Sequence, residues 1–304
     1  MTTRRFSKSW LKSLRPFAHY LWSRKILLSL VLGSIALLSW LTTPAQAFQV
    51  QVNPTNPQLG DTISVIVPSD GSAAPTVTRG DRTYPTYAIS GNRYRALVPT
   101  SPLDRPGRFT VRVNKGGETQ DVALNLRGRS FPTQRITVRG GGSDGTDFEM
   151  NRVEQFKEIR SPEKFWNGAM QRPNRGEISS VYGVRRYYNG VFADNYYHKG
   201  VDYAGGTGSP VTAPAAGRVV LVGRVADGFR LHGNTIGLDH GQGVGSIFIH
   251  LSRIDVREGD MVQAGQTIGA LGATGSATGP NLHWGLYVNG VSVDPVPWRY
   301  DGFE

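Results

Sequence analysis

Two short motifs carry the side chains that could do chemistry in this chain. Residues 198–202 read His-Lys-Gly-Val-Asp, and residues 281–283 read Asn-Leu-His. Imidazole and carboxylate groups both bind Zn²⁺, and three protein ligands with a fourth position left open are typical of a hydrolytic zinc site. The chain has no cysteine, so thiolates cannot hold a metal here. His198, Asp202 and His283 are therefore candidate zinc ligands.

Strands would have to bring these residues together. In a strand, residues two or four apart point to the same face, so His198 can share a face with Asp202, and Asn281 with His283. Two strands could then present the three candidate ligands toward one point. The chain lacks a His-Glu-x-x-His pattern, which excludes a helical zinc site of that type. On spacing alone, an ordinary hydrogen bond between His198 and Asp202 is the alternative.

The pattern along the chain predicts a mainly β protein with two domains. Residues 48–128 alternate apolar and polar side chains between turns, which favours a β-sandwich of the immunoglobulin type. Residues 129–175 are a predicted linker, with one short helix within 148–165. Residues 176–304 lack a sustained helical period and predict an antiparallel β domain. Its strands are expected at 217–222, 234–239, 245–250, 262–271 and 282–288.

Residues 1–47 differ from the rest in charge and hydropathy. They hold seven basic and no acidic residues, and without them the net charge falls from +11 to +4. The apolar run 26–41 and the Ala-Gln-Ala sequence ending at Ala47 predict a signal peptide cut after Ala47, with an uncleaved membrane anchor as the alternative. The remaining charge gives no reason to expect a nucleic-acid partner.

Several motifs in residues 162–300 resemble the LytM/lysostaphin-type zinc metallopeptidases. They agree with that family in order and spacing, and residues 48–128 resemble an immunoglobulin-like module that often precedes its peptidase domain. The motifs are Ser-Ser-Val-Tyr-Gly-Val-Arg at 179–185, Tyr-His-Lys-Gly-Val-Asp-Tyr-Ala at 197–204, Val-Thr-Ala-Pro-Ala-Ala-Gly-Arg-Val at 211–219, Asp-His-Gly at 239–241, Ile-His-Leu-Ser at 249–252, Gly-Asp-Met-Val-Gln-Ala-Gly-Gln at 259–266 and Thr-Gly-Pro-Asn-Leu-His-Trp at 278–284.

The resemblance implies a fold, a site and a substrate. The C-terminal domain is expected to have the duplicated hybrid motif of the family, with His198, Asp202 and His283 as zinc ligands and His250 as a catalytic residue. The implied substrate is the peptide part of peptidoglycan, cut by an endopeptidase in the periplasm or cell envelope of a bacterium. Asn281 departs from the pattern, because the family usually has a second catalytic histidine there.

This departure bears on the expected chemistry. Zinc with three protein ligands lowers the pKa of a bound water to about 7, and His250 can carry protons near that pH. The amide of Asn281 can donate a hydrogen bond to a developing oxyanion but cannot act as a base. His250 would then work alone, and we expect reduced but real hydrolysis.

The sequence indicates the roles of two other histidines and six aromatic residues only weakly. His232 and His240 sit near Asp or Gly and are expected to bind no metal. Aromatic side chains around the site could line a groove for a peptide or a glycan, or could simply pack at turns. They are Tyr182, Tyr187, Tyr188, Tyr196, Tyr197 and Trp284.

Three other functions stay open from the sequence. Asn281 favours a non-catalytic member that binds the wall and regulates a partner cell-wall amidase. The glycine-turn rhythm of 211–222 and 256–271 resembles biotinyl and lipoyl carrier folds, but no lysine follows Lys199 to be modified. Finally, residues 48–128 could themselves be an adhesion or docking domain.

Overall fold

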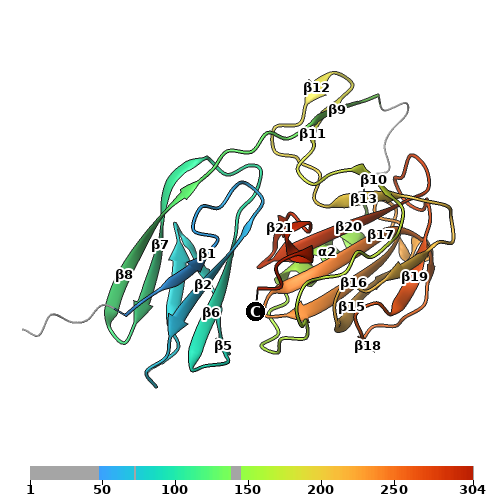
Figure 1. Ribbon diagram of the computed structural model, residues 1–304. Coiled ribbons are helices and arrows are strands. Elements are labelled where there is room, and N and C mark those ends of the chain that lie inside the picture. Colours follow the sequence, from blue (N-terminus) through green and yellow to red (C-terminus); the bar gives the residue numbers. More distant parts are fainter. Residues whose placement is uncertain (1–47, 72, 138–144, 304) are drawn as a thin grey trace, which may run out of the picture. The chain divides into compact units, whose positions relative to one another are not determined.

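The computed structural model describes residues 48–71, 73–137 and 145–303 (Figure 1). The predicted signal peptide, the alternative anchor and the cleavage site at Ala47 lie outside these residues. Within the described residues, no helix is both long and apolar enough to cross a membrane. The fold is mainly β, as the sequence predicts.

Residues 48–126 form two four-stranded antiparallel sheets with orders β1-β2-β6-β5 and β4-β3-β7-β8. Inward side chains from both sheets, such as Val65, Val98 and Val113, are fully buried in one cluster. The immunoglobulin type of this sandwich stays a prediction. Its strands are β1 (Gln51–Asn53), β2 (Thr62–Pro68), β3 (Thr76–Arg79), β4 (Arg82–Tyr84), β5 (Thr86–Ile89), β6 (Arg93–Pro99), β7 (Gly107–Lys115) and β8 (Glu118–Leu126).

The C-terminal part is built on a ten-stranded sheet whose main path runs β10-β13-β20-β17-β16-β15-β18. All of its pairings are antiparallel, and the predicted strands recur in it with shifted ends. Its strands are β10 (Glu177–Ser180), β13 (Val201–Ala204), β14 (Pro210–Thr212), β15 (Gly217–Gly223), β16 (Asn234–Gly241), β17 (Val244–Ile254), β18 (Met261–Val262), β19 (Thr267–Leu271), β20 (Asn281–Val288) and β21 (Val291–Val293). Two short 3-10 helices, η1 (Val225–Asp227) and η2 (Pro297–Arg299), complete it.

The predicted linker contains more structure than the sequence suggests. Its helix, α2 (Asp147–Glu158), begins at the N-cap Thr146, whose side chain accepts from the backbone of Glu149. It ends ahead of Ser161 and Pro162, as expected for a residue pair that disfavours helix. The linker also supplies β9 (Thr133–Ile136), which pairs in parallel with β11 (Arg185–Tyr188), itself paired with β12 (Val191–Phe192). No alternation in the sequence marks this small sheet.

The two faces of β20 have different neighbours, and this positions the site. Leu282, Trp284, Leu286 and Val288 belong to the main hydrophobic cluster, so His283 and Tyr287 lie on the opposite face. Helix α2 covers the far end of that second face. There Phe156 packs edge-on against Tyr287, with ring centroids 6.0 Å apart. The end of the face that carries His283 is left for the candidate site.

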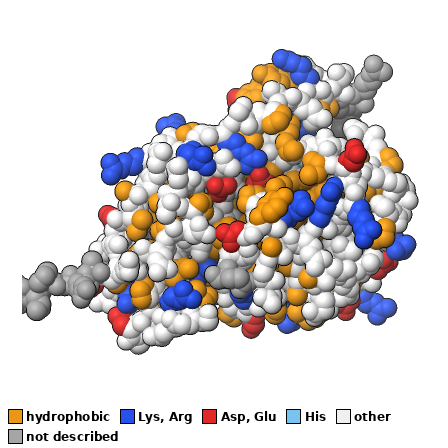
Figure 2. All heavy atoms as spheres, viewed as in Figure 1, with side chains coloured by type: hydrophobic (Ala, Val, Ile, Leu, Met, Phe, Trp, Pro, Cys, Tyr) orange, Lys and Arg blue, Asp and Glu red, His pale blue; other side chains and the backbone are white. Residues whose placement is uncertain are grey.

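Charged side chains are interspersed over the described surface. On the face seen in Figure 2, basic groups lie among acidic and hydrophobic ones, and no continuous basic stripe is visible among the described residues. The picture agrees with the small net charge that remains once residues 1–47 are set aside.

Candidate metal centre

Three predicted ligand atoms converge on one point. His198 Nε2 lies 3.0 Å from Asp202 Oδ1 and 3.0 Å from His283 Nδ1, and the last two atoms are 2.8 Å apart. Asp202 in β13 is the direct cross-strand partner of His283 in β20. His198 lies in the loop before β13 rather than in a strand. The shared strand face that the sequence suggested for His198 and Asp202 is therefore wrong, although the convergence is correct.

The donor set fits a zinc ion. Zinc binds imidazole nitrogen at about 2.0–2.1 Å and carboxylate oxygen at about 2.0–2.2 Å, so one ion can contact three atoms spaced this closely. His198 Nδ1 lies 2.8 Å from the carbonyl oxygen of Val181. An N–H there leaves Nε2 with a free lone pair, which is the arrangement that orients metal-binding histidines. His198 and His283 are 2% and 9% exposed, so both rings are held by packing.

Burial and mutual contacts set the charges of this triad. Burial alone would raise the pKa of Asp202, but its close contacts with the rings of His198 and His283 outweigh it and hold that pKa well below its usual range. Burial lowers the pKa of His283 to about 4, although its contact with the Asp202 carboxylate opposes the shift. At neutral pH the triad therefore offers one carboxylate and a neutral His283, which is the protonation that metal binding needs.

Gly200 allows β13 and β20 to approach each other at the triad. A Cβ on this residue would lie 2.3 Å from the carbonyl oxygen of Trp284 and 2.8 Å from Cε1 of His283. Neither atom can give way without moving a strand or a candidate ligand. The glycine between His198 and Asp202 is thus required by packing.

We expect Gly200→Ala to destabilise the fold by about 1–3 kcal/mol, the usual cost of overpacking, and to weaken zinc binding by displacing His283. Chemical denaturation and zinc content would measure the two effects. Gly206→Ala is the matched control, because a Cβ at Gly206 meets nothing within 4 Å. Equal stability and zinc content in the two variants would contradict the packing role.

His250 lies beside the triad at an irregularity of β17. Its neighbour Ile249 is the cross-strand partner of His283, and the pairing of β17 with β16 shifts register around it. The backbone of His250 has φ 66°, in the left-handed region. Its Nδ1 lies 2.8 Å from the carbonyl oxygen of Thr274. An N–H at Nδ1 leaves Nε2 free to accept a proton.

The pKa of His250 favours the neutral ring. Burial lowers this pKa below its ordinary value, while the hydrogen bond to Thr274 and the charge of Asp202 oppose the shift. The charges of His232 and His198 add to the lowering. A neutral imidazole beside the candidate ligands can serve as a base at neutral pH.

Asn281 begins β20, two residues from His283. Its Nδ2 donates to the carbonyl oxygen of Gly279 at 2.8 Å, and its backbone N–H donates to Gly272. A side-chain amide has two N–H bonds, so one remains beyond the bond to Gly279. Asn281 thus has the N–H donor expected from its residue type and no basic atom.

Three of the six aromatic residues that the sequence left open between a groove and packing are packing residues. Tyr182, Tyr197 and Trp284 are 1%, 6% and 0% exposed and belong to the main hydrophobic core. Tyr187, Tyr188 and Tyr196 are only half-buried. Arg186 donates to the hydroxyl of Tyr196 at 2.9 Å. The aromatic residues that stay accessible therefore come from β11 and the loop after β12.

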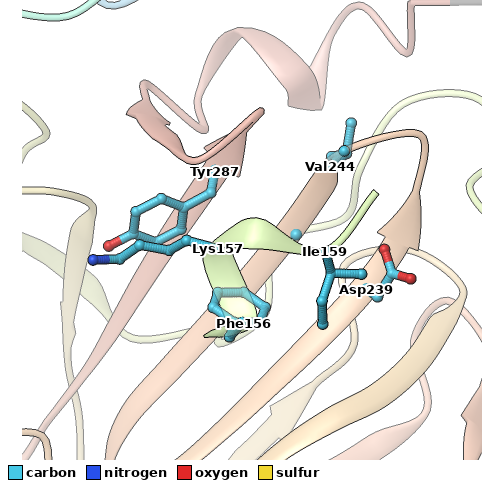
Figure 3. A pocket seen from close by; sticks show the side chains of 8 residues that line it. Phe156, Lys157, Ile159, Asp239, Val244 and Tyr287 are labelled. Carbon is cyan, nitrogen blue, oxygen red and sulfur yellow. The ribbon is translucent and has the colours of Figure 1, made fainter. Parts of the chain in front are cut away.

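A pocket on the same sheet lies away from the triad. It sits between the C-terminal end of α2 and strands β16, β17 and β20, as Figure 3 shows. Tyr287 lines it and lies four residues from His283 along β20, or roughly 13 Å at about 3.3 Å per residue. This pocket is a packing feature beneath the helix. It is lined by Phe156, Lys157, Ile159, Asp239, Gly243, Val244, Gly245 and Tyr287.

A hydrogen-bonded pair next to His250, formed by His232 and Glu149, was not expected from the sequence. His232 Nδ1 lies 2.6 Å from Glu149 Oε1, and the Glu149 side chain is fully buried. The one signal in the sequence is an acidic residue in the first turn of α2, a placement that the helix dipole alone explains. His240, by contrast, is buried between Ala216 and Ser246 as a structural residue.

A family match identifies the domain that contains these residues. Residues 196–295 match peptidase family M23. This segment contains His198, Asp202, His250 and His283 in order. It is a peptidase family M23 domain. The resemblance to LytM/lysostaphin-type peptidases that the motifs indicate is thereby confirmed for the C-terminal part of the chain.

Relatives of the M23 domain include named cell-wall peptidases. Over 119 residues it is 38% identical to the DD-carboxypeptidase/endopeptidase Mpg of Neisseria meningitidis, which covers 39% of this chain and 26% of that protein. Over 122 residues it is 39% identical to lysostaphin of Staphylococcus simulans, covering 38% and 24%. The chain thus spans about a quarter of the length of these relatives.

A solved structure is similar over more of the chain. A peptidase M23 from Pseudomonas aeruginosa is 28% identical, covers 82% of this chain and 96% of that one, and superimposes with a TM-score of 0.60. The similarity therefore extends beyond the M23 domain into the part that precedes it. It supports the mainly β fold of the chain.

Proposed function

We propose that the protein is a zinc metalloendopeptidase that hydrolyses stem peptides or peptide cross-links of bacterial peptidoglycan. The observation that carries the proposal is the convergence of His198 Nε2, Asp202 Oδ1 and His283 Nδ1 within 3.0 Å of one another in an M23 domain. The names of the relatives, DD-carboxypeptidase/endopeptidase and lysostaphin, supply the substrate class. Such a substrate implies export to the periplasm or cell envelope.

In this proposal the triad binds the metal and His250 transfers protons. When bound by His198, Asp202 and His283, zinc supplies a Lewis acid that activates water and polarises a carbonyl group. His250 then acts through Nε2, because its Nδ1 is engaged with Thr274. It accepts the proton of the attacking water and returns it to the leaving amine. Its lowered pKa keeps Nε2 unprotonated at neutral pH.

Asn281 limits the rate in this proposal. Its remaining amide N–H can donate to the oxygen on which negative charge develops, a contribution worth about 10²–10³ in kcat at other oxyanion sites. It offers no second base, so proton transfer depends on His250. The expected enzyme is active but slower than one with two histidines.

Asn281→His is accordingly expected to raise kcat by about 10-fold or more, since an added acid–base group typically contributes about 10²–10⁴. Zinc content and KM should stay close to wild type, because His283 and the strand it occupies are unchanged. Steady-state kinetics on a cross-linked peptide would measure this. An unchanged kcat with zinc retained would show that Asn281 does not limit the reaction.

The test of the function is mass spectrometry of purified peptidoglycan incubated with the zinc-loaded protein. Release of peptides cut at one type of bond, abolished by a chelator and restored by zinc, is the expected result. The mass of the fragments also identifies the bond. If no peptide is released at any zinc concentration, the proposal is wrong.

A second candidate follows from Asn281 alone. The domain could bind peptidoglycan without cutting it and regulate a partner cell-wall amidase. In that case, the protein would sediment with peptidoglycan and raise the activity of the amidase while releasing no peptide itself. The same incubation therefore separates the two candidates.

A further inference from the structure

A buried carboxylate ties helix α2 to the loop beside His250. Glu149 Oε2 accepts the backbone N–H groups of Arg230 and Leu231 at 2.9 and 3.0 Å. Its Oε1 lies 2.6 Å from both the backbone nitrogen and Nδ1 of His232. Burial would raise the pKa of Glu149, but the N–H groups of His232 and Leu231 outweigh it and keep the group ionised. All four donors belong to three consecutive residues, so one side chain fixes their backbone.

The loop that Glu149 binds is itself hydrogen-bonded to the backbone of His250. The carbonyl oxygen of His232 accepts the backbone N–H of His250 at 2.9 Å. That bond supports a residue at φ 66°, a conformation that costs a non-glycine residue energy and persists only when its surroundings enforce it.

The same loop also binds the turn that contains Thr274, the hydrogen-bond partner of the His250 ring. Leu231 accepts from the backbone of Ser276, and the backbone N–H of Asn234 donates to Thr274 Oγ1, both at 2.9 Å. The turn 272–276 is thereby fixed, and it presents the carbonyl oxygen of Thr274 to His250 Nδ1. The backbone and the ring of His250 therefore both depend on the loop that Glu149 organises.

We propose that Glu149 is a positioning residue for His250, acting through the loop 230–234. The inference rests on the proposed role of His250 as base. Nothing in the packing of α2 requires a carboxylate at this place, since the helix is already held by Val153 and Phe156. A buried charge destabilises the fold unless hydrogen-bond partners compensate it. The partners of Glu149 are residues 230–232, which belong to the loop that contacts His250.

The test is Glu149→Gln. The amide keeps the size of the side chain but removes the charge and replaces one acceptor oxygen with a donor that faces N–H groups. We expect kcat to fall on the order of 10²-fold, as a misplaced catalytic group does, with KM and zinc content unchanged. Glu154→Gln is the matched control on the same helix, because that side chain is 59% exposed, and wild-type kcat is expected.

A readout independent of activity completes the experiment. In protein labelled with ¹⁵N-histidine, His250 of the wild type should show a single tautomer with its proton on Nδ1, identified by the loss of its signals in His250→Ala. Glu149→Gln should show a mixture. If the wild type releases no peptide, the proposed function fails while this arm still tests the positioning. A zinc-loaded Glu149→Gln with wild-type kcat or an unchanged tautomer overturns the inference. Should that variant fail to fold, Glu149→Asp replaces it under the same criteria.

Discussion

Replacing Asp202 with asparagine is expected to remove zinc binding and, with it, peptidoglycan hydrolysis. Asp202 is the one anionic member of the triad, and its Oδ1 lies within 3.0 Å of the ligand nitrogens of His198 and His283. The amide that replaces it carries no charge and binds a cation weakly. Loss of a residue that merely supports a ligand costs about 10- to 100-fold in metal affinity, so the loss of a ligand should exceed 100-fold.

Zinc content after dialysis against a chelator and reloading would measure this effect, with peptide release as the second readout. Asp255→Asn is the matched control, because it makes the same chemical change at a residue paired with Arg253 on the surface. The control should keep both zinc and activity. A zinc-loaded Asp202→Asn protein would disprove the ligand assignment, whatever its activity.

His250→Ala is expected to separate zinc binding from catalysis. The variant should keep its zinc, because His250 is not one of the three converging groups. It should lose about 10²–10⁴ in kcat, the usual contribution of a general base. The loss should lie near the upper end, since Asn281 cannot take over proton transfer. Metal analysis would check that zinc is retained, and single-turnover rates on a defined peptide would check the loss of catalysis. Unchanged rates would show that the base is another residue.

The pH profile gives the same assignment a second test. A pKa of His250 below the ordinary histidine value of about 6.5 means that the ring loses its proton at lower pH than a free imidazole. The base form therefore persists below pH 6.5, and the ionisation of His250 in the kcat/KM profile should lie below that value. This ionisation should shift to higher pH in a variant that exposes the ring to solvent. A profile that is the same in that variant and in the wild type would contradict the assignment.

Much of the fold could be predicted because alternation along a strand is a local property. Residues 282–288 alternate so that Leu282, Trp284 and Leu286 face the core, and the structure keeps that alternation. The same alternation puts His283 on the other face. The prediction failed where the contact is not periodic, as with the parallel pairing of β9 and β11, since parallel partners far apart in sequence leave no shared pattern.

The candidate ligands could likewise be named from residue types and motif order. Their convergence could not be derived from spacing, because His198 reaches the triad from a loop and not from a strand. It depends on the pairing of Asp202 with His283, which is a property of the assembled sheet.

The sequence by itself determined which side chains the candidate site offers: two imidazoles, one carboxylate, a third histidine and an asparagine. Only the tertiary structure decided how His250 is held. His250 takes a left-handed backbone conformation because loop 230–234 and Thr274 enforce it, and Glu149 organises that loop from a helix about 80 residues earlier in the chain. Side-chain types are written in the sequence, but hydrogen bonds between distant segments exist only once the hydrophobic core has brought those segments together.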